Sequence, residues 1–217
     1  MLNSRSQASQ DLFVIFMTKG KKKGAFLEIG ANDAVAHSNT FLLEKEFQWS
    51  GLMVEFVPNF VAQYVAYRPN SKYIIQDATQ VNYVEQMKDF PKNLDYLQID
   101  LDVDNRSTLT TLENLNSDLF NDHKFATVTF EHDIYTGNYF DTQKASREIF
   151  SSRGYVLVFS NVKVFWLGDW KSFEDWYAHP DLVDANLLQQ VKQDPENVDG
   201  INHNKCLEIL KKYVNLE

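Results

Sequence analysis

Short apolar runs alternate with helical patterns through the first 153 residues, and this alternation constrains the fold more than any other feature of the chain. Five runs have the length and composition of buried strands: 25–29, 51–55, 72–75, 96–99 and 126–130. The helical patterns are 38–47, a segment from Pro58, a segment from about Ser107, and 141–153. Repeated strand–helix units predict a parallel sheet with helices on both faces. We therefore expect an α/β fold with a doubly wound sheet.

Two more apolar runs, 155–159 and 162–167, are separated only by Ser160 and Asn161. A turn this short joins antiparallel strands, so we expect a hairpin here. The hairpin would bring the sheet to seven strands, most of them parallel, with the antiparallel pair at its C-terminal edge.

The chain after Trp170 carries helical patterns at 172–179, 182–192 and 204–214. No repeat, low-complexity tract or Pro/Gly/Ser linker divides the sequence. We therefore expect a single domain over 1–217, with a core of about 6–167 and a helical extension of about 170–217.

Composition excludes several classes of protein. The 217 residues are 44% hydrophobic, which is ordinary for a chain that buries a full core, and the net charge is −9. A negative field repels phosphate backbones and anionic lipids, so we expect no nucleic-acid partner. The apolar run 12–17 is much shorter than the ~20 residues that span a bilayer, and it lacks the flanks of a signal peptide. We expect no membrane span and, with a single Cys206, a cytoplasmic location.

All five of the first strands end at a carboxylate: Glu28, Glu55, Asp77, Asp100 and Glu131. Ligands of open α/β sheets bind beyond the carboxyl ends of the strands. Solvated turn residues would account for one or two of these acids, but five in succession predict a shared acidic edge. Such an edge can accept hydrogen bonds from hydroxyl groups or hold an amine or a cation.

The turn after the first strand indicates which cofactor this edge would hold. A dinucleotide site needs the pattern G-x-G-x-x-G, whereas residues 28–34 contain a single glycine, Gly30. The acid that precedes this glycine repels phosphate, which disfavours an NAD-dependent enzyme and suits S-adenosylmethionine, a cofactor with an ammonium and no phosphate. Glu55 would then accept from the ribose hydroxyls and Asp77 from the adenine amine. Asp100, at the end of the fourth strand, completes this predicted cofactor site.

Segments 6–14, 26–33, 38–44 and 49–55 together resemble the opening of the FkbM-type methyltransferases. These enzymes are class I S-adenosylmethionine-dependent O-methyltransferases, and many act on sugars and glycans. The similarity covers about 6–165, and Ala34 departs from it because glycine is common at that position. It implies that the cofactor's methionine part is surrounded by Glu28, Gly30, Ala31, Asn32, Ser38, Asn39 and Thr40. It also implies that Glu55 holds the ribose and that Asp77 and Ala78 contact the adenine.

Segment 99–109 is closer to the I-D-x-D-x-Y-x-S-T-x-x-x-L segment of macrocin-type (TylF) sugar O-methyltransferases. This resemblance implies that Asp100 binds magnesium and that Asp102 is the base. It also implies that Glu131 and His132, at the end of the fifth strand, are the two further ligands that complete the metal site. Since His132 departs from that pattern, Asp133 is the alternative third ligand. Three carboxylates favour Mg²⁺, whereas a histidine ligand favours Mn²⁺.

Each of these assignments has a simpler alternative. Asp100–Asn105 also resembles the start of an EF-hand loop, although Asn105 and Thr111 stand where that loop needs Gly and Glu. Asp102 could cap the following helix, and His132 could be a structural histidine. Trp170 either packs the C-terminal part of the chain or, as Tyr135 could, forms a platform for a sugar ring.

The sequence thus predicts a metal-assisted O-methyltransferase that acts on a sugar hydroxyl of a glycan or glycoconjugate, with Asp102 or His132 as the base. The alternatives are a non-catalytic domain that keeps the fold and the cofactor, and a methyltransferase for a non-sugar small molecule. No motif identifies the sugar or the oligomeric state.

Overall fold

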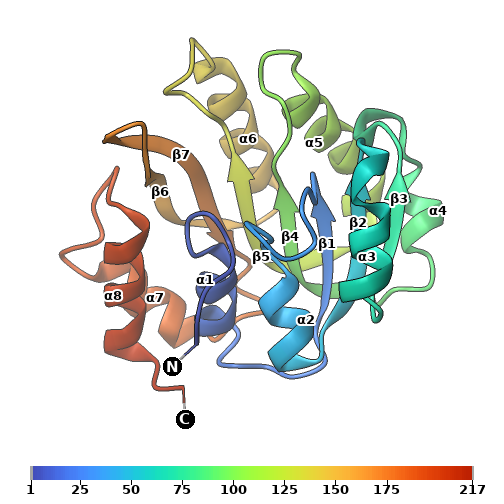
Figure 1. Ribbon diagram of the computed structural model, residues 1–217. Coiled ribbons are helices and arrows are strands. Elements are labelled where there is room, and N and C mark those ends of the chain that lie inside the picture. The colour runs from blue at the N-terminus through green and yellow to red at the C-terminus, as the bar shows by residue number, and fades with distance from the viewer. Residues whose placement is uncertain (1, 217) are drawn as a thin grey trace.

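A computed structural model describes residues 2–216 as one seven-stranded sheet with helices on both faces (Figure 1). The strands are β1 (Ala25–Ile29), β2 (Ser50–Glu55), β3 (Lys72–Ile75), β4 (Asn93–Ile99), β5 (Lys124–Glu131), β6 (Val156–Trp166) and β7 (Asp169–Ala178). Their order in the sheet is β3-β2-β1-β4-β5-β7-β6. The first five strands pair in parallel, and β7 pairs antiparallel with both β5 and β6. The predicted doubly wound, mostly parallel sheet with a C-terminal hairpin is confirmed.

Two apolar cores lie on the two faces of this sheet. The α-helices are α1 (Gln10–Met17), α2 (Phe41–Phe47), α3 (Val61–Tyr67), α4 (Tyr83–Met87), α5 (Ser107–Ser117), α6 (Phe140–Ser152), α7 (Ala185–Gln193) and α8 (His203–Tyr213). Short 3-10 helices are η1 (Pro58–Phe60), η2 (Ala78–Gln80) and η3 (Leu119–Asn121). Side chains of α1, α2, α3, α7 and α8 form the core on one face, and those of α4, α5 and α6 form the other.

The hairpin lies at a different place from the one predicted. The chain does not turn at Ser160 and Asn161 but continues through them as the single strand β6, which pairs with β7 through several register shifts. Asn161 takes a positive φ of 52°, and its backbone N–H donates to Asp175 Oδ1 at 2.8 Å. The two polar residues therefore form a bulge that is held by neighbouring side chains. The turn itself lies at Leu167 and Gly168.

The predicted helix at 172–179 was wrong, because residues 172–178 belong to strand β7. It lies between β5 and β6, where both of its edges pair, and its residues from Phe173 to His179 are buried. Pairing with strands distant in the sequence overrides the local helical pattern. The other two predicted helices are present as α7 and α8.

Helix α1 was not predicted, although its apolar run was noted. All eight of its residues are buried, and it packs against α8 and α2 (Figure 1). Across residues 2–216, no helix combines the length and the apolar character needed to cross a bilayer.

Candidate functional site

The carboxyl ends of β1, β2 and β4 surround a cavity of about 300 Å³, which we call the rim cavity. Its lining residues are Gln7, Glu28, Gly30, Ala31, Asn32, His37, Asn39, Glu55, Asp100, Leu101 and Asp102. Parallel strands of one sheet end at the same edge, and this is why acids spaced far apart in the sequence meet here. The volume is at the lower end of the range for small-molecule sites. Most of the residues predicted to bind the cofactor therefore line one hollow.

Gly30 allows β1 and β4 to approach each other at the floor of the rim cavity. Its φ is +85°, and a Cβ atom at this position would lie 1.8 Å from the backbone oxygen of Asp100. The N–H groups of Gly30 and Ala31 both donate to Val54 O, at 2.9 and 3.1 Å. The single glycine of the turn is thus required by the packing of the strand ends, and any other residue would separate them.

Glu28 is almost fully buried and anchors the segment that follows the turn. Thr40 Oγ1 donates to its Oε2 at 2.6 Å, and the Asn39 N–H donates to its Oε1 at 3.2 Å. Burial raises the pKa of Glu28, and the positive charge of Arg68, 3.8 Å away, opposes this rise. Ser38 and Thr40 therefore stand behind Glu28 and do not line the cavity, whereas Asn39 does.

Arg68 is a buried counter-ion that the sequence reasoning missed. Its guanidinium pairs with Glu44 at 3.0 Å and donates to Ser38 Oγ at 3.2 Å. A lone arginine at the end of a helix carries no local sign of burial. The signal was the excess of acids on elements that must pack together, because buried carboxylates need a cation nearby.

Glu55 holds the loop between β1 and α2 in place. Its Oε2 accepts from the Asn32 N–H, and its Oε1 accepts from the N–H groups of Phe56 and Val57, all at 2.8 Å. A carboxylate has about four acceptor sites, so roughly one remains for a ligand. Phe56, the next residue in the chain, is 71% exposed.

Asp77 and Ala78 do not line the rim cavity. Asp77 is exposed, and its Oδ1 accepts from both the N–H and the hydroxyl of Thr79. Asp77 is thereby the N-cap residue of η2. Ala78 is buried in the core on the α4–α6 face. Both residues follow β3, the edge strand of the sheet, and β2 lies between β3 and β1. Because β3 is short, it ends before it can carry these two residues to the rim cavity.

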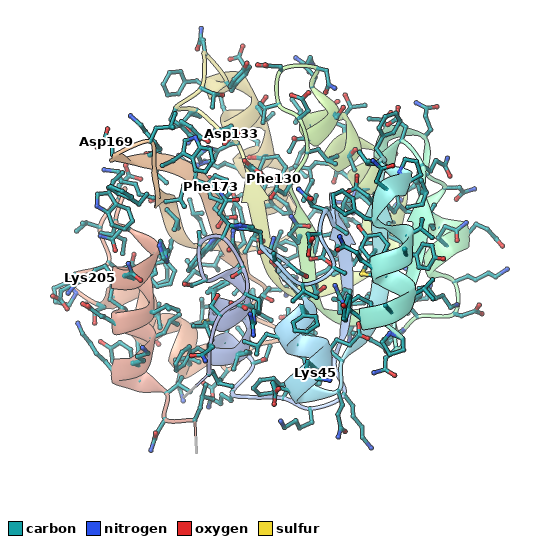
Figure 2. All side chains as sticks on the ribbon, viewed as in Figure 1. Lys45, Phe130, Asp133, Asp169, Phe173 and Lys205 are labelled. Atoms are coloured by element: carbon teal, nitrogen blue, oxygen red, sulfur yellow. The ribbon has the colours of Figure 1, made fainter. Side chains whose placement is uncertain are left out.

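Asp100 and Asp133 are two acids at this edge whose pKa values are both raised. Burial raises the pKa of Asp100 to about 7, with further increases from the charges of Asp133, Glu28 and Glu55. Burial also raises the pKa of Asp133 to about 6, although His132 and a hydrogen bond from Tyr135 oppose the rise. Asp133 lies beside Phe173, whose carbonyl accepts its N–H at 3.1 Å (Figure 2). The Oδ1 atom of Asp133 is buried and has no hydrogen-bond partner among the described residues.

Asp102 lines the rim cavity and does not cap the next helix. Its Oδ1 accepts from the Asp104 N–H at 3.1 Å, while α5 begins at Ser107 with Arg106 in the N-cap position and no side-chain cap. The side chain of Asp102 is exposed and reaches the cavity from the loop after β4. The capping alternative is therefore wrong.

His132 is fully buried and lies outside the rim cavity. Its Nε2 is 3.6 Å from Asp175 Oδ1 and 3.4 Å from Gln143 Nε2, and its Nδ1 has no hydrogen-bond partner in the described part of the chain. Burial would raise the pKa of Asp175, but His132 and Arg147 together hold that pKa below its ordinary value. These contacts fit the structural alternative for His132, in which the ring is held by its neighbours and not by a ligand.

The predicted metal site is not assembled. Within residues 2–216, no three His, Cys, Asp or Glu side chains are grouped so that they could hold a metal ion. Glu131 faces Glu174 on β7, and neither Glu131 nor Asp133 lines the cavity that contains Asp100. The donor set therefore does not fit Mg²⁺ or Mn²⁺, and the EF-hand alternative fails for the same reason.

Three residues that the sequence reasoning did not assign to the site also line the rim cavity: Gln7, His37 and Leu101. A bridge between Ser6 and His37 joins the N-terminal segment to the loop after β1. Gln7 lies inside the motif 6–14, so that motif was the available signal for it. Glu174 was not predicted to lie at this edge of the sheet, because its segment was predicted as a helix.

Two solved methyltransferases have similar folds. A precorrin-6y C5,15-methyltransferase from Geobacter metallireducens GS-15 has a TM-score of 0.53 at 13% identity, covering 77% of this chain and 86% of its own. A methyltransferase from Pyrococcus furiosus has a TM-score of 0.50 at 13% identity, covering 77% and 80%. No protein-family model and no curated protein matches this chain. The comparisons establish the Rossmann-like fold that these methyltransferases share.

Proposed function

We propose that this chain is an S-adenosylmethionine-dependent O-methyltransferase that methylates a sugar hydroxyl of a glycan or glycoconjugate. The observation that carries the proposal is the rim cavity, where Glu28, Glu55 and Asp100 surround a turn with one glycine. The fold likeness to methyltransferases supports methyl transfer. The sequence resemblance to FkbM-type enzymes supports a sugar acceptor.

The residues of the rim cavity suit a cationic ligand that has no phosphate. Asn39 lines the cavity, and its buried Oδ1 has no hydrogen-bond partner among residues 2–216, so it is available to accept from an ammonium group. The remaining acceptor site of Glu55 suits a ribose hydroxyl, and Phe56 suits the face of an adenine ring. Asp77 and Ala78 would contact the far edge of that ring, outside the cavity.

The reaction needs a base that takes the proton of the acceptor hydroxyl. Bound S-adenosylmethionine supplies an activated methyl group on a sulfonium, which leaves as a neutral thioether. Asp102, exposed at the mouth of the cavity, is the proposed base and accepts the hydroxyl proton as the oxygen attacks. Asp100 stands next to it with a pKa of about 7, close to the pH at which a base works best.

His132 would act in this scheme through Asp133 and not on the acceptor. It lowers the pKa of the Asp133 carboxyl, and Asp133 in turn raises the pKa of Asp100. No step uses a metal ion, because the donor set does not fit one. A cytoplasmic location and the absence of a nucleic-acid partner belong to the proposal as well, and the net charge of −9 supports the second.

The second candidate is a domain that binds the cofactor without catalysis. The observation that favours it is that His132, one of the two predicted bases, lies outside the rim cavity and that no metal site is assembled within residues 2–216. Calorimetry with S-adenosylhomocysteine and with NAD would first establish the cofactor, and only the former should bind. Transfer of a labelled methyl group to a panel of glycans, with and without EDTA, would then separate the two candidates. Turnover that is insensitive to EDTA is expected, and binding without turnover on any glycan would favour the second candidate.

A further inference from the structure

The β6–β7 hairpin extends well beyond the edge of the sheet at which the rim cavity lies. Glu174 on β7 pairs with Glu131, the last residue of β5, so Asp169–Phe173 continue past the end of β5. Five residues of extended chain span roughly 17 Å. Figure 1 shows this hairpin at the same end of the sheet as the arrowheads of β1, β4 and β5. Its exposed apolar residues are Phe165, Trp166, Leu167 and Trp170.

One face of this hairpin borders a second cavity. Phe165 pairs with Trp170 and Lys163 with Ser172, so Lys163 and Trp170 lie on the same face of the hairpin. A hollow of about 270 Å³, which we call the hairpin cavity, is lined on this face by Lys163, Trp170, Gly200, Ile201, Asn202 and Lys205. The opposite face carries Val164 and Phe173, which pack against Ala8.

Hydrogen bonds fix the floor of the hairpin cavity. The Lys163 N–H donates to Ile201 O at 2.9 Å, and the Gly200 N–H donates to Ser160 O at 3.0 Å. The ring of Trp170 lies against that of His203, with centroids 5.8 Å apart. The loop before α8 is thus attached to the edge of β6, so the hollow is formed before any ligand arrives.

The charges around the hairpin cavity leave one ammonium group free. Lys205 pairs with Glu196 at 2.7 Å and with Glu208 at 3.1 Å, so its charge is already balanced. Lys163 makes no ion pair with any residue in 2–216. The N-terminus of α8, capped by Asn202, adds a partial positive charge at the same place. A free ammonium beside a half-exposed indole ring suits a ring-shaped ligand that carries an anionic group.

The N-terminal segment links the hairpin cavity to the rim cavity. Gln7 lines the rim cavity, while two residues later Ser9 Oγ is 3.0 Å from Nδ1 of His203. Figure 2 shows Asp169 on the hairpin and Lys205 on α8 at the same side of the molecule. The N-terminal segment therefore contacts the rim cavity at Gln7 and, through His203, the Trp170 ring of the hairpin cavity.

We propose that the hairpin cavity is an acceptor subsite for an acidic sugar, with the sugar ring on the face of Trp170 and its carboxylate at Lys163. The assignment of this sugar to the acceptor rests on the proposed function. The subsite itself rests only on the geometry of the hairpin, the loop 200–202 and the start of α8. A uronic acid has both required parts, a ring with an apolar face and a carboxylate.

The test is a titration of the full chain with methyl β-D-glucuronide, in which binding is measured by isothermal titration calorimetry. Saturable binding is expected, and Trp170→Ala and Lys163→Met should each weaken it about tenfold. Trp166→Ala and Lys171→Met are matched controls on the opposite face of the same hairpin, and they should leave the affinity unchanged. No saturation by about 10 mM, or equal losses in the controls, would overturn the subsite.

Two further ligands make the assignment specific. Methyl β-D-glucoside, which lacks the carboxylate, should bind at least about tenfold more weakly than the glucuronide. Tighter binding of glucose 6-phosphate than of the glucuronide would overturn the choice of a uronic acid. S-adenosylhomocysteine should bind all variants alike, which shows that they fold. If the wild type fails to bind S-adenosylhomocysteine yet binds the glucuronide, the proposed function fails while the subsite stands.

Discussion

Glu174 lies directly opposite Glu131 in the β5–β7 pairing, so the two carboxyl groups are cross-strand neighbours on one face of the sheet. Burial raises the pKa of Glu174 well above its ordinary value, although Trp176 Nε1 donates to its Oε1 at 2.7 Å. The next residue, Asp175, points to the other face, where Arg147 Nε donates to it at 2.7 Å and where His132 and Arg147 together hold its pKa low. Two adjacent acids of one strand thus favour opposite protonation states.

This contrast predicts different costs for two neighbouring amide substitutions. Glu174→Gln should change the free energy of unfolding by less than about 1 kcal/mol, because the buried carboxyl already favours its neutral form. Asp175→Asn should cost about 3 kcal/mol, because it leaves Arg147 without its charged partner. Urea denaturation at pH 7 measures both values. Equal costs would contradict the assignment of the two protonation states.

The close approach at Gly30 predicts a loss of both stability and cofactor binding in Gly30→Ala. A Cβ atom there would meet Asp100 O at 1.8 Å, so the ends of β1 and β4 must separate. The control is Gly168→Ala, which has a similar φ of +84° but no atom within 4 Å of the added Cβ. The control should lose about 1 kcal/mol of stability from backbone strain alone, and Gly30→Ala about 2–3 kcal/mol more. Thermal unfolding and calorimetry with S-adenosylhomocysteine give the two measurements.

The buried arginine predicts a large loss of stability in Arg68→Met. Glu28 and Glu44 would lose their shared cation in the interior, at a cost of about 3–5 kcal/mol. Adding Glu28→Gln should restore part of this loss, since it removes one of the two buried charges. Arg106→Met changes an exposed arginine and should cost less than about 0.5 kcal/mol. No recovery in the double variant would argue against the ion pair as the cause.

The raised pKa of Asp100 predicts how stability depends on pH. With a pKa of about 7 in the folded chain against 3.8 for an unperturbed carboxyl, the native state binds more protons than the unfolded state between these values. The free energy of unfolding should therefore fall as the pH rises from about 4 to 7. In Asp100→Asn, the fall between pH 5 and pH 8 should be smaller by about 1 kcal/mol or more. Asp104→Asn, a change in an exposed acid, should keep the wild-type dependence.

The proposed base predicts a kinetic effect without a binding effect. Asp102→Asn should lower kcat by about 10²–10⁴-fold and leave the affinity for S-adenosylhomocysteine within about twofold. Asp104→Asn again serves as the control, because its exposed side chain does not line the rim cavity. Unchanged turnover in Asp102→Asn would move the role of base to another carboxyl group, with Asp100 the first to examine.

The sequence alone was sufficient for the alternation of strands and helices, the parallel pairing of the first five strands and the acidic edge of the sheet. These features depend on local periodicity and on a few residues with a fixed backbone role, such as Gly30. Repeated strand–helix units have few ways to fold, so acids at the strand ends must come together at one edge.

Only the tertiary structure decided which of these acids share a cavity and what the last third of the chain does. Segment 172–179 became a strand because β5 and β6 offer partners on both of its edges, and this placed Glu174 beside Glu131 and Asp175 beside His132. Asp77 fell outside the rim cavity because β3 is short, and Lys163 met Trp170 because the hairpin turns at Gly168. Contacts of this kind join residues far apart in the chain, so their energies have no trace in any local pattern.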